Sequence, residues 1–141
     1  MCARACVVGL GQLRRLDLSN NGLAALPDGA LRHSPSIQRV VLDNNRLTTL
    51  RQCSLATGAF AVPPYLRTLS LLGNPLYCDC RLAWLLSVSR STTVDVWWAA
   101  CRGGLDDNQT DVIRHHSYYA LTQSGVCAAA STTLHDCPFN I

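Results

Sequence analysis

Aliphatic residues recur with the same spacing in three segments of the first half of the chain. The segments start at Leu13, Ile37 and Leu66, and each follows the pattern L-x-x-L-x-L-x-x-N-x-L, where L is any aliphatic residue. The second segment begins 24 residues after the first, and the third begins 29 residues after the second. The aliphatic positions are Leu13, Leu16, Leu18, Leu23, Ile37, Val40, Leu42, Leu47, Leu66, Leu69, Leu71 and Leu76, and the asparagines are Asn21, Asn45 and Asn74. A match at every position identifies an internal repeat.

The L-x-L centre of each repeat predicts a short β-strand. Aliphatic and other residues alternate there with a period of two, so the aliphatic side chains are expected to point inward and the intervening ones toward solvent. The asparagine that follows is expected to turn the chain, with its side chain bonding backbone groups that the turn leaves unpaired.

The outward positions of the strands are the candidate recognition surface. Stacking of the repeats places Arg15 beside Arg39, and a mixed-charge surface with arginine anchors suits a protein partner. A merely solvated face is the alternative, and a flat polar face is poor ground for catalysis. The candidate binding residues are Arg15, Asp17, Gln38, Arg39, Val41, Asp43, Arg67 and Ser70.

These repeats resemble the leucine-rich repeat family, and the 24-residue unit ending in LPDGAL resembles its common extracellular type. The resemblance implies an α/β solenoid over residues 1–77, with units starting near 13, 37 and 66 and short parallel strands on a concave face. The longer second repeat contains RQCSLATGAFAVPPY. This insertion is interpreted either as a binding loop or as ordinary length variation on the convex side.

A cysteine-rich segment follows the third repeat. The sequence NPLYCDCRLAWLL, residues 74–86, resembles the C-terminal cap of extracellular leucine-rich repeat proteins. The resemblance implies a cap over residues 78–127, with one disulfide between Cys78 and Cys101 and another between Cys80 and Cys127, or alternatively Cys137. Leu82, Leu85 and Leu86 lie at i, i+3 and i+4, which predicts a short helix that covers the last repeat. Trp97 and Trp98 are expected to pack over these disulfides.

Metal and cofactor chemistry are not predicted. Zinc is the alternative for Cys78, Cys80 and Cys101, with a fourth ligand from His115, His116 or Cys127. The C-x-C spacing, however, is not the usual C-x₂₋₄-C zinc knuckle, and a redox C-x-x-C motif is absent from the sequence.

Composition indicates an extracellular or cell-surface location. Eight cysteines in 141 residues point to an oxidising compartment. The sequence has no apolar run long enough to span a bilayer, and its first residues, MCARACVVGLGQLRR, make a poor signal peptide. The simplest interpretation of these observations is a fragment of a longer protein. Asn108 begins an Asn-Gln-Thr glycosylation sequon.

Charge does not favour nucleic acid as a partner. The net charge is +3, which is too small by itself to indicate nucleic-acid binding. Neither Lys nor Glu occurs, so every positive side chain is a guanidinium that can hold a carboxylate through two hydrogen bonds. Residues 1–77 carry a net +5 and residues 78–141 a net −2.

An acidic and histidine-containing segment, DDNQTDVIRHHSYY, could supply an Asp–His pair for a hydrolase. No nucleophile or metalloprotease motif accompanies it, so a polar surface segment is favoured. The sequence therefore predicts a non-enzymatic module that binds a protein ligand or co-receptor on its concave face. The alternatives are a cytosolic scaffold and a partial gene model in which residues 128–141 are not native.

Overall fold

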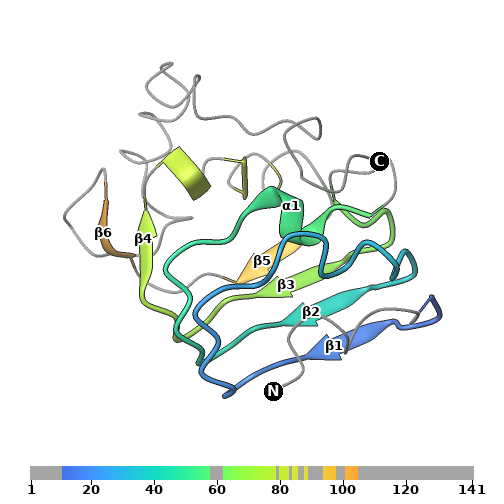
Figure 1. The fold of residues 1–141 in the computed structure, drawn as a ribbon, viewed down its shortest axis with the longest axis horizontal. Helices are drawn as coiled ribbons and strands as arrows, with labels where there is room; N and C mark the ends of the chain where they lie inside the picture. Colours follow the sequence, from blue (N-terminus) through green and yellow to red (C-terminus); the bar gives the residue numbers. More distant parts are fainter. Residues whose placement is uncertain are drawn as a thin grey trace.

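The fold is seen in a computed structural model that describes residues 11–57, 62–78, 80–82, 84–85, 88, 94–97 and 101–104. Its main element is a four-stranded parallel sheet in the order β1-β2-β3-β5 (Figure 1). The strands are β1 (Arg15–Asp17), β2 (Arg39–Val41), β3 (Thr68–Ser70) and β5 (Asp95–Trp97). The three repeats supply β1, β2 and β3, which confirms the predicted strand in each L-x-L segment.

The strands stack in register, so equivalent residues of successive repeats form rows across the sheet. Leu16 pairs with Val40, Val40 with Leu69, and Leu69 with Val96. This row points into the core, where Val40, Leu69 and Val96 are at most 5% exposed. The inward direction of the aliphatic positions is therefore confirmed.

The fourth strand, β5, was not predicted. It lies beyond the third repeat, and its pairing with β3 extends the sheet of the repeats by one strand. Its Val94-Asp95-Val96-Trp97 segment alternates apolar and polar residues at its start, which is a period-two signal. That signal is short and no turn asparagine follows it, so the repeat pattern did not include it.

The repeat asparagines form a ladder of hydrogen bonds between successive turns. Asn45 donates from Nδ2 to the carbonyl oxygens of Leu42 and Leu18, and its Oδ1 accepts from the backbone N–H groups of Asn21 and Leu23. The residues that precede the three asparagines, Asn20, Asn44 and Gly73, share a left-handed backbone with φ of 60°, 55° and 72°. Asn and Gly tolerate that conformation best, so each repeat carries a turn residue suited to it.

Asn74 repeats the arrangement one turn further along. Its Nδ2 donates to the carbonyl oxygens of Leu71 and Leu42, and its Oδ1 accepts from the N–H of Leu47. Each buried asparagine thus bonds backbone groups of its own turn and of the turn before it. The sequence pattern predicted the bonds within the turn but not the link to the preceding turn.

The side of the core opposite the sheet is closed by irregular chain and one short helix, α1 (Gln52–Leu55). Cys53, Ser54 and Leu55 of α1 are buried, and the Ser54 hydroxyl donates to the carbonyl of Leu26 at 2.6 Å. Cys53 is disulfide-bonded. The inserted segment of the second repeat therefore begins as part of the core.

Part of the predicted cap helix also lies in the core. A 3₁₀ turn, η1 (Cys80–Leu82), leads into helical residues at 84–85. Leu82 and Leu85 are fully buried, and Trp84 donates from Nε1 to the carbonyl of Leu50 at 2.9 Å. This confirms Leu82 and Leu85 as residues that cover the last repeat, whereas Leu86 lies outside the described residues.

A second, two-stranded parallel sheet joins β4 (Leu76–Cys78) to β6 (Cys101–Gly104). Its register places Cys101 beside Leu76, so the backbones of the predicted Cys78–Cys101 pair lie on neighbouring strands. The side chains of Cys78, Cys80 and Cys101 fall outside the described part, as do Cys127, Asn108 and the whole of residues 105–141. The predicted disulfides of the cap remain predictions. No helix in the described ranges is long and apolar enough to cross a membrane.

Candidate interaction surface on the sheet

The candidate surface is the side of the four-stranded sheet that faces away from the core, here named the strand face. The register builds it from two rows of side chains. One row contains Arg15, Arg39, Thr68 and Asp95, and the other contains Asp17, Val41, Ser70 and Trp97. The first row is basic at the β1 end, and the second row ends in the aromatic side chain of Trp97 on β5.

Most of the candidate binding residues on and beside the strand face are at least partly exposed, as the sequence predicts. Arg15, Asp17, Gln38 and Arg67 are exposed as expected, and Arg39 and Asp43 are half-buried.

Two candidate binding residues are corrected, because the structure buries them. Val41 is 6% exposed and Ser70 is fully buried. Both belong to central strands with a paired strand on each side, and the Ser70 hydroxyl donates a hydrogen bond to Asp43. The prediction that Val41 and Ser70 face solvent is wrong.

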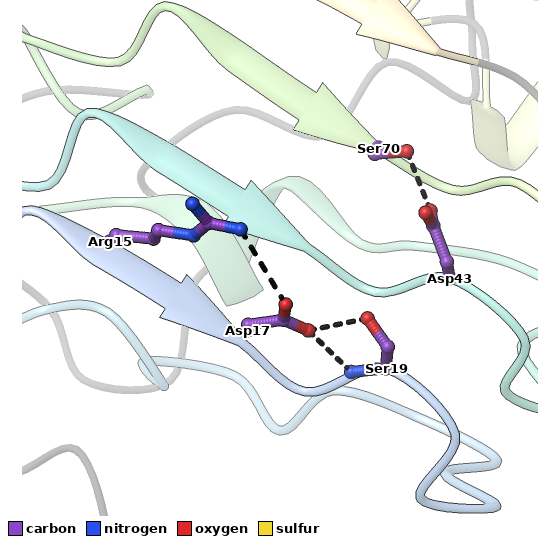
Figure 2. Close-up of polar contacts among 5 residues, drawn as sticks. All are labelled: Arg15, Asp17, Ser19, Asp43 and Ser70. Carbon is purple, nitrogen blue, oxygen red and sulfur yellow. Dashed lines mark hydrogen bonds and ion pairs between the residues drawn. The ribbon is translucent and has the colours of Figure 1, made fainter.

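The carboxylates of Asp17 and Asp43 are bound within the chain (Figure 2). Asp17 accepts from the N–H of Ser19 at 3.0 Å and from the Ser19 hydroxyl, and Arg15 Nη2 lies 3.8 Å from its other oxygen. These contacts hold the pKa of Asp17 below its usual value, with the Ser19 hydroxyl and then the Ser19 N–H as the largest causes.

Asp43 links the second and third repeats in the same way. One of its oxygens accepts from the Ser70 hydroxyl at 2.5 Å and from the N–H of Leu72 at 3.0 Å (Figure 2). Asp17 and Asp43 therefore both use hydrogen-bonding capacity on neighbouring serine and backbone donors.

Arg39 and Trp97 meet across the strand that separates them. The guanidinium carbon of Arg39 lies 5.5 Å from the centre of a Trp97 ring, a cation–π distance. Between them β3 presents the short side chains of Thr68 and Ser70, which leave room for this contact. The structure places the Trp97 ring on the strand face, and the disulfides over which it was expected to pack lie outside the described residues.

The contact leaves aromatic surface exposed and one guanidinium nitrogen without a hydrogen bond to any described residue. Trp97 is 45% exposed, and Arg39 Nε is buried without a hydrogen-bond partner among the described residues. Sequence reasoning had Arg39 as a candidate but missed Trp97, since only the unpredicted strand β5 brings the ring to this face.

The described ranges contain no group of three or more His, Cys, Asp or Glu that could hold a metal ion. The side chains of the zinc alternative lie outside these ranges. The described part of the strand face offers hydrogen-bond donors, one cation–π pair and exposed apolar side chains. These groups are typical of a binding surface.

Comparison with known protein families decides what the repeats are. The family model described as "Leucine rich repeat" matches residues 11–76.

Residues 11–76 are leucine-rich repeats.

Curated relatives contain similar leucine-rich repeats. Over 117 residues the chain is 32% identical to the rat protein named "Leucine-rich repeat and fibronectin type-III domain-containing protein 4", which covers 73% of this chain and 18% of the relative. It is 31% identical over 128 residues to the chicken high affinity nerve growth factor receptor, covering 91% of this chain and 14% of the receptor. The chain thus spans less than a fifth of the length of these relatives.

The same fold occurs in a solved structure described as the octameric complex of Latrophilin 3, Unc5D and FLRT2 (LRR). The likeness has a TM-score of 0.63 at 24% identity and covers 76% of this chain and 32% of that chain. It establishes the solenoid arrangement of the leucine-rich repeats. Strand β5 lies beyond the matched residues 11–76, yet it belongs to the same sheet.

Proposed function

We propose that this chain is a protein-binding module from the extracellular part of a cell-surface or secreted leucine-rich repeat protein. A protein ligand or co-receptor binds on the strand face, and the module carries out no catalysis. The observation that carries the proposal is the Arg39–Trp97 pair, which is held in place yet partly exposed on a sheet of otherwise short or internally bonded side chains. Arginine and tryptophan are the residues most enriched at the energetic centres of protein interfaces.

The extracellular context is supported by cysteine chemistry and by relatives. Cys53 is disulfide-bonded and fully buried, and disulfides persist mainly in oxidising compartments. One relative is named as a growth factor receptor, and the fold is shared with a chain from a complex of several proteins. The proposal includes the cap disulfides Cys78–Cys101 and Cys80–Cys127 and a glycan on Asn108.

The experiment is a glycan block of the strand face. Thr68→Asn creates an Asn-Leu-Ser sequon on β3, and Arg46→Asn creates an Asn-Leu-Thr sequon just beyond the turn of the second repeat, outside the sheet. Both variants are secreted from mammalian cells as multivalent fusions of the full chain, and mass spectrometry verifies that each new sequon is occupied. Each fusion is then tested against a panel of purified ectodomains.

A partner found with the unmodified chain should be lost with the Thr68 variant and retained with the Arg46 variant. Retention by a fully glycosylated Thr68 variant would remove the strand face from the proposal. Thiol alkylation of the secreted chain before and after reduction tests the compartment, since free thiols at every cysteine would contradict an extracellular protein.

A further inference from the structure

We infer that Arg39 and Trp97 form an anchor for a partner segment that carries a carboxylate next to an apolar side chain. This inference rests on the proposed function and narrows it to one site and one partner chemistry. The anchor is defined by three side chains: Arg39 on β2, Trp97 on β5, and Leu72 just after β3.

The charge of the partner group follows from how the acids and arginines of the strand face are engaged. Asp17 and Asp43 already accept hydrogen bonds from serine and backbone donors. Among the described residues, no carboxylate lies within ion-pair distance of Arg39, and the same holds for Arg14 and Arg67 near the start of β1 and β3. The positive charge near the start of these strands is therefore matched best by a carboxylate from outside the described chain.

The geometry of Arg39 prepares it for such a group. The guanidinium lies over the Trp97 ring, with its carbon 5.5 Å from the ring centre, and the burial of Nε restricts the side chain further. A planar guanidinium binds a carboxylate through two parallel hydrogen bonds, and little rotamer entropy remains to be lost when the group is held beforehand.

An apolar side chain of the partner has a place beside the carboxylate. Trp97 is 45% exposed and Leu72 is 41% exposed. Leu72 lies two residues after Ser70, and Ser70 is the register partner of Trp97, so both exposed apolar side chains belong to the same end of the sheet. Two exposed apolar side chains at one end of the sheet offer apolar area to a side chain of the partner.

A protein segment fits this arrangement better than a sulfated polysaccharide. A long polyanion requires an unbroken basic track. Here Asp95 ends the row that contains Arg15 and Arg39, and Asp17 and Asp43 flank it. One carboxylate on Arg39 avoids these acids, whereas a polysaccharide chain would pass over them.

The test is selection from a phage-displayed library of random peptides against the full secreted chain. Peptides that contain Asp or Glu beside an aromatic or aliphatic residue should be enriched. Arg39→Gln removes the charge and keeps a polar side chain, and it should lower the affinity of a selected peptide about tenfold or more. Trp97→Leu should have a similar effect, and Arg46→Gln, at an exposed arginine outside the sheet, should leave the affinity unchanged.

Two results of the peptide selection would overturn the inference. Enrichment of basic or uncharged peptides contradicts the carboxylate, and a lack of enrichment over the Arg39→Gln/Trp97→Leu double variant contradicts the anchor itself. Thermal melts and circular dichroism of every variant verify the fold, so that a loss of binding reports on the surface. Retention on immobilised heparin that disappears with Arg39→Gln would assign the site to a polysaccharide instead.

The ectodomain partner found by the glycan-block experiment separates this inference from the proposed function. If the glycan at position 68 abolishes binding of that partner but Arg39→Gln and Trp97→Leu do not, the strand face binds protein and the anchor is misplaced. If the glycan at position 68 has no effect, both fail.

Discussion

The first two repeats share one sequence pattern but differ in how completely the structure buries it. In the first repeat Leu16 and Leu18 are half-buried and Asn21 is exposed. In the second repeat the equivalent Val40 and Leu42 are fully buried, and Asn45 is 6% exposed. Strand β2 is paired on both sides, whereas β1 is paired with β2 alone within the described residues. A repeat motif therefore specifies a shape, and stacking of neighbouring repeats supplies most of its stability.

The largest expected difference between the two repeats is at the leucine that follows each strand. Leu42→Ala removes a fully buried side chain from the centre of the core and should lower the free energy of unfolding by about 2–5 kcal/mol. Leu18→Ala removes a half-buried side chain and should cost roughly half as much or less. Urea denaturation of both variants measures the difference, and equal losses would show that the first repeat is as well supported as the second.

The asparagine ladder provides the next comparison. Asn45→Ala leaves the Leu18 carbonyl, the Leu42 carbonyl and two N–H groups without their side-chain partner, so a loss of about 2–3 kcal/mol is expected. Asn21→Ala removes bonds of an exposed side chain to the Leu18 and Ser19 carbonyls, where water can replace it, and should cost about 1 kcal/mol or less. The same denaturation assay applies, and a larger loss for Asn21→Ala would contradict the dependence on burial.

Gly22 lies in an open turn and Gly73 lies in a crowded one. Gly22 and Gly73 both have a left-handed backbone, so alanine at either site should cost about 1 kcal/mol through conformation alone. An added Cβ at Gly22 meets nothing within 4 Å, whereas at Gly73 it would lie 2.1 Å from Asn44 Oδ1 and 3.4 Å from Asn44 Cα. Gly73→Ala should therefore be the more destabilising variant by about another 1 kcal/mol. Thermal melts of the pair provide the measurement, and identical melting temperatures would indicate that the Asn44 side chain moves aside freely.

The smallest expected effect concerns the exposed Asp17 of the first repeat. Because its pKa is lowered by the Ser19 hydroxyl and N–H, Ser19→Ala should raise that pKa toward the usual aspartate value, and Arg15→Ala should raise it less. A lowered pKa in the folded chain stabilises the fold above the pKa of the unfolded chain, and this contribution is lost as the pH falls through the folded value. Carboxyl carbon shifts followed by NMR during a pH titration measure each pKa. A larger rise with Arg15→Ala would assign the shift to the ion pair.

The parts of the fold that sequence predicts are those repeated several times. The inward leucines, the turn asparagines and the strands each recur at equivalent positions, so local preference and neighbouring repeats agree. The burial of Leu82 and Leu85 was also predictable, because their helical spacing follows an otherwise open end of the core.

The parts that sequence misses depend on long-range stacking. Val41 and Ser70 occupy outward positions, but they lie on central strands paired on both sides, and the Ser70 hydroxyl bonds Asp43 of the preceding repeat. Trp97 reaches the strand face only because β5 pairs with β3, and a single short strand without the repeat motif carries too little signal. The Arg39–Trp97 contact spans 58 positions of sequence and has no local pattern at all.

The position of Trp97 gives the chain a built-in optical reporter. An indole ring that is nearly half exposed on the proposed docking surface should change its emission when a partner removes it from water or approaches it with a carboxylate. The difference between the spectra of the unmodified chain and a Trp97→Phe variant isolates this signal from the other tryptophans. Complex formation could then be followed in solution, at equilibrium or in a stopped-flow mixer, without attaching a dye.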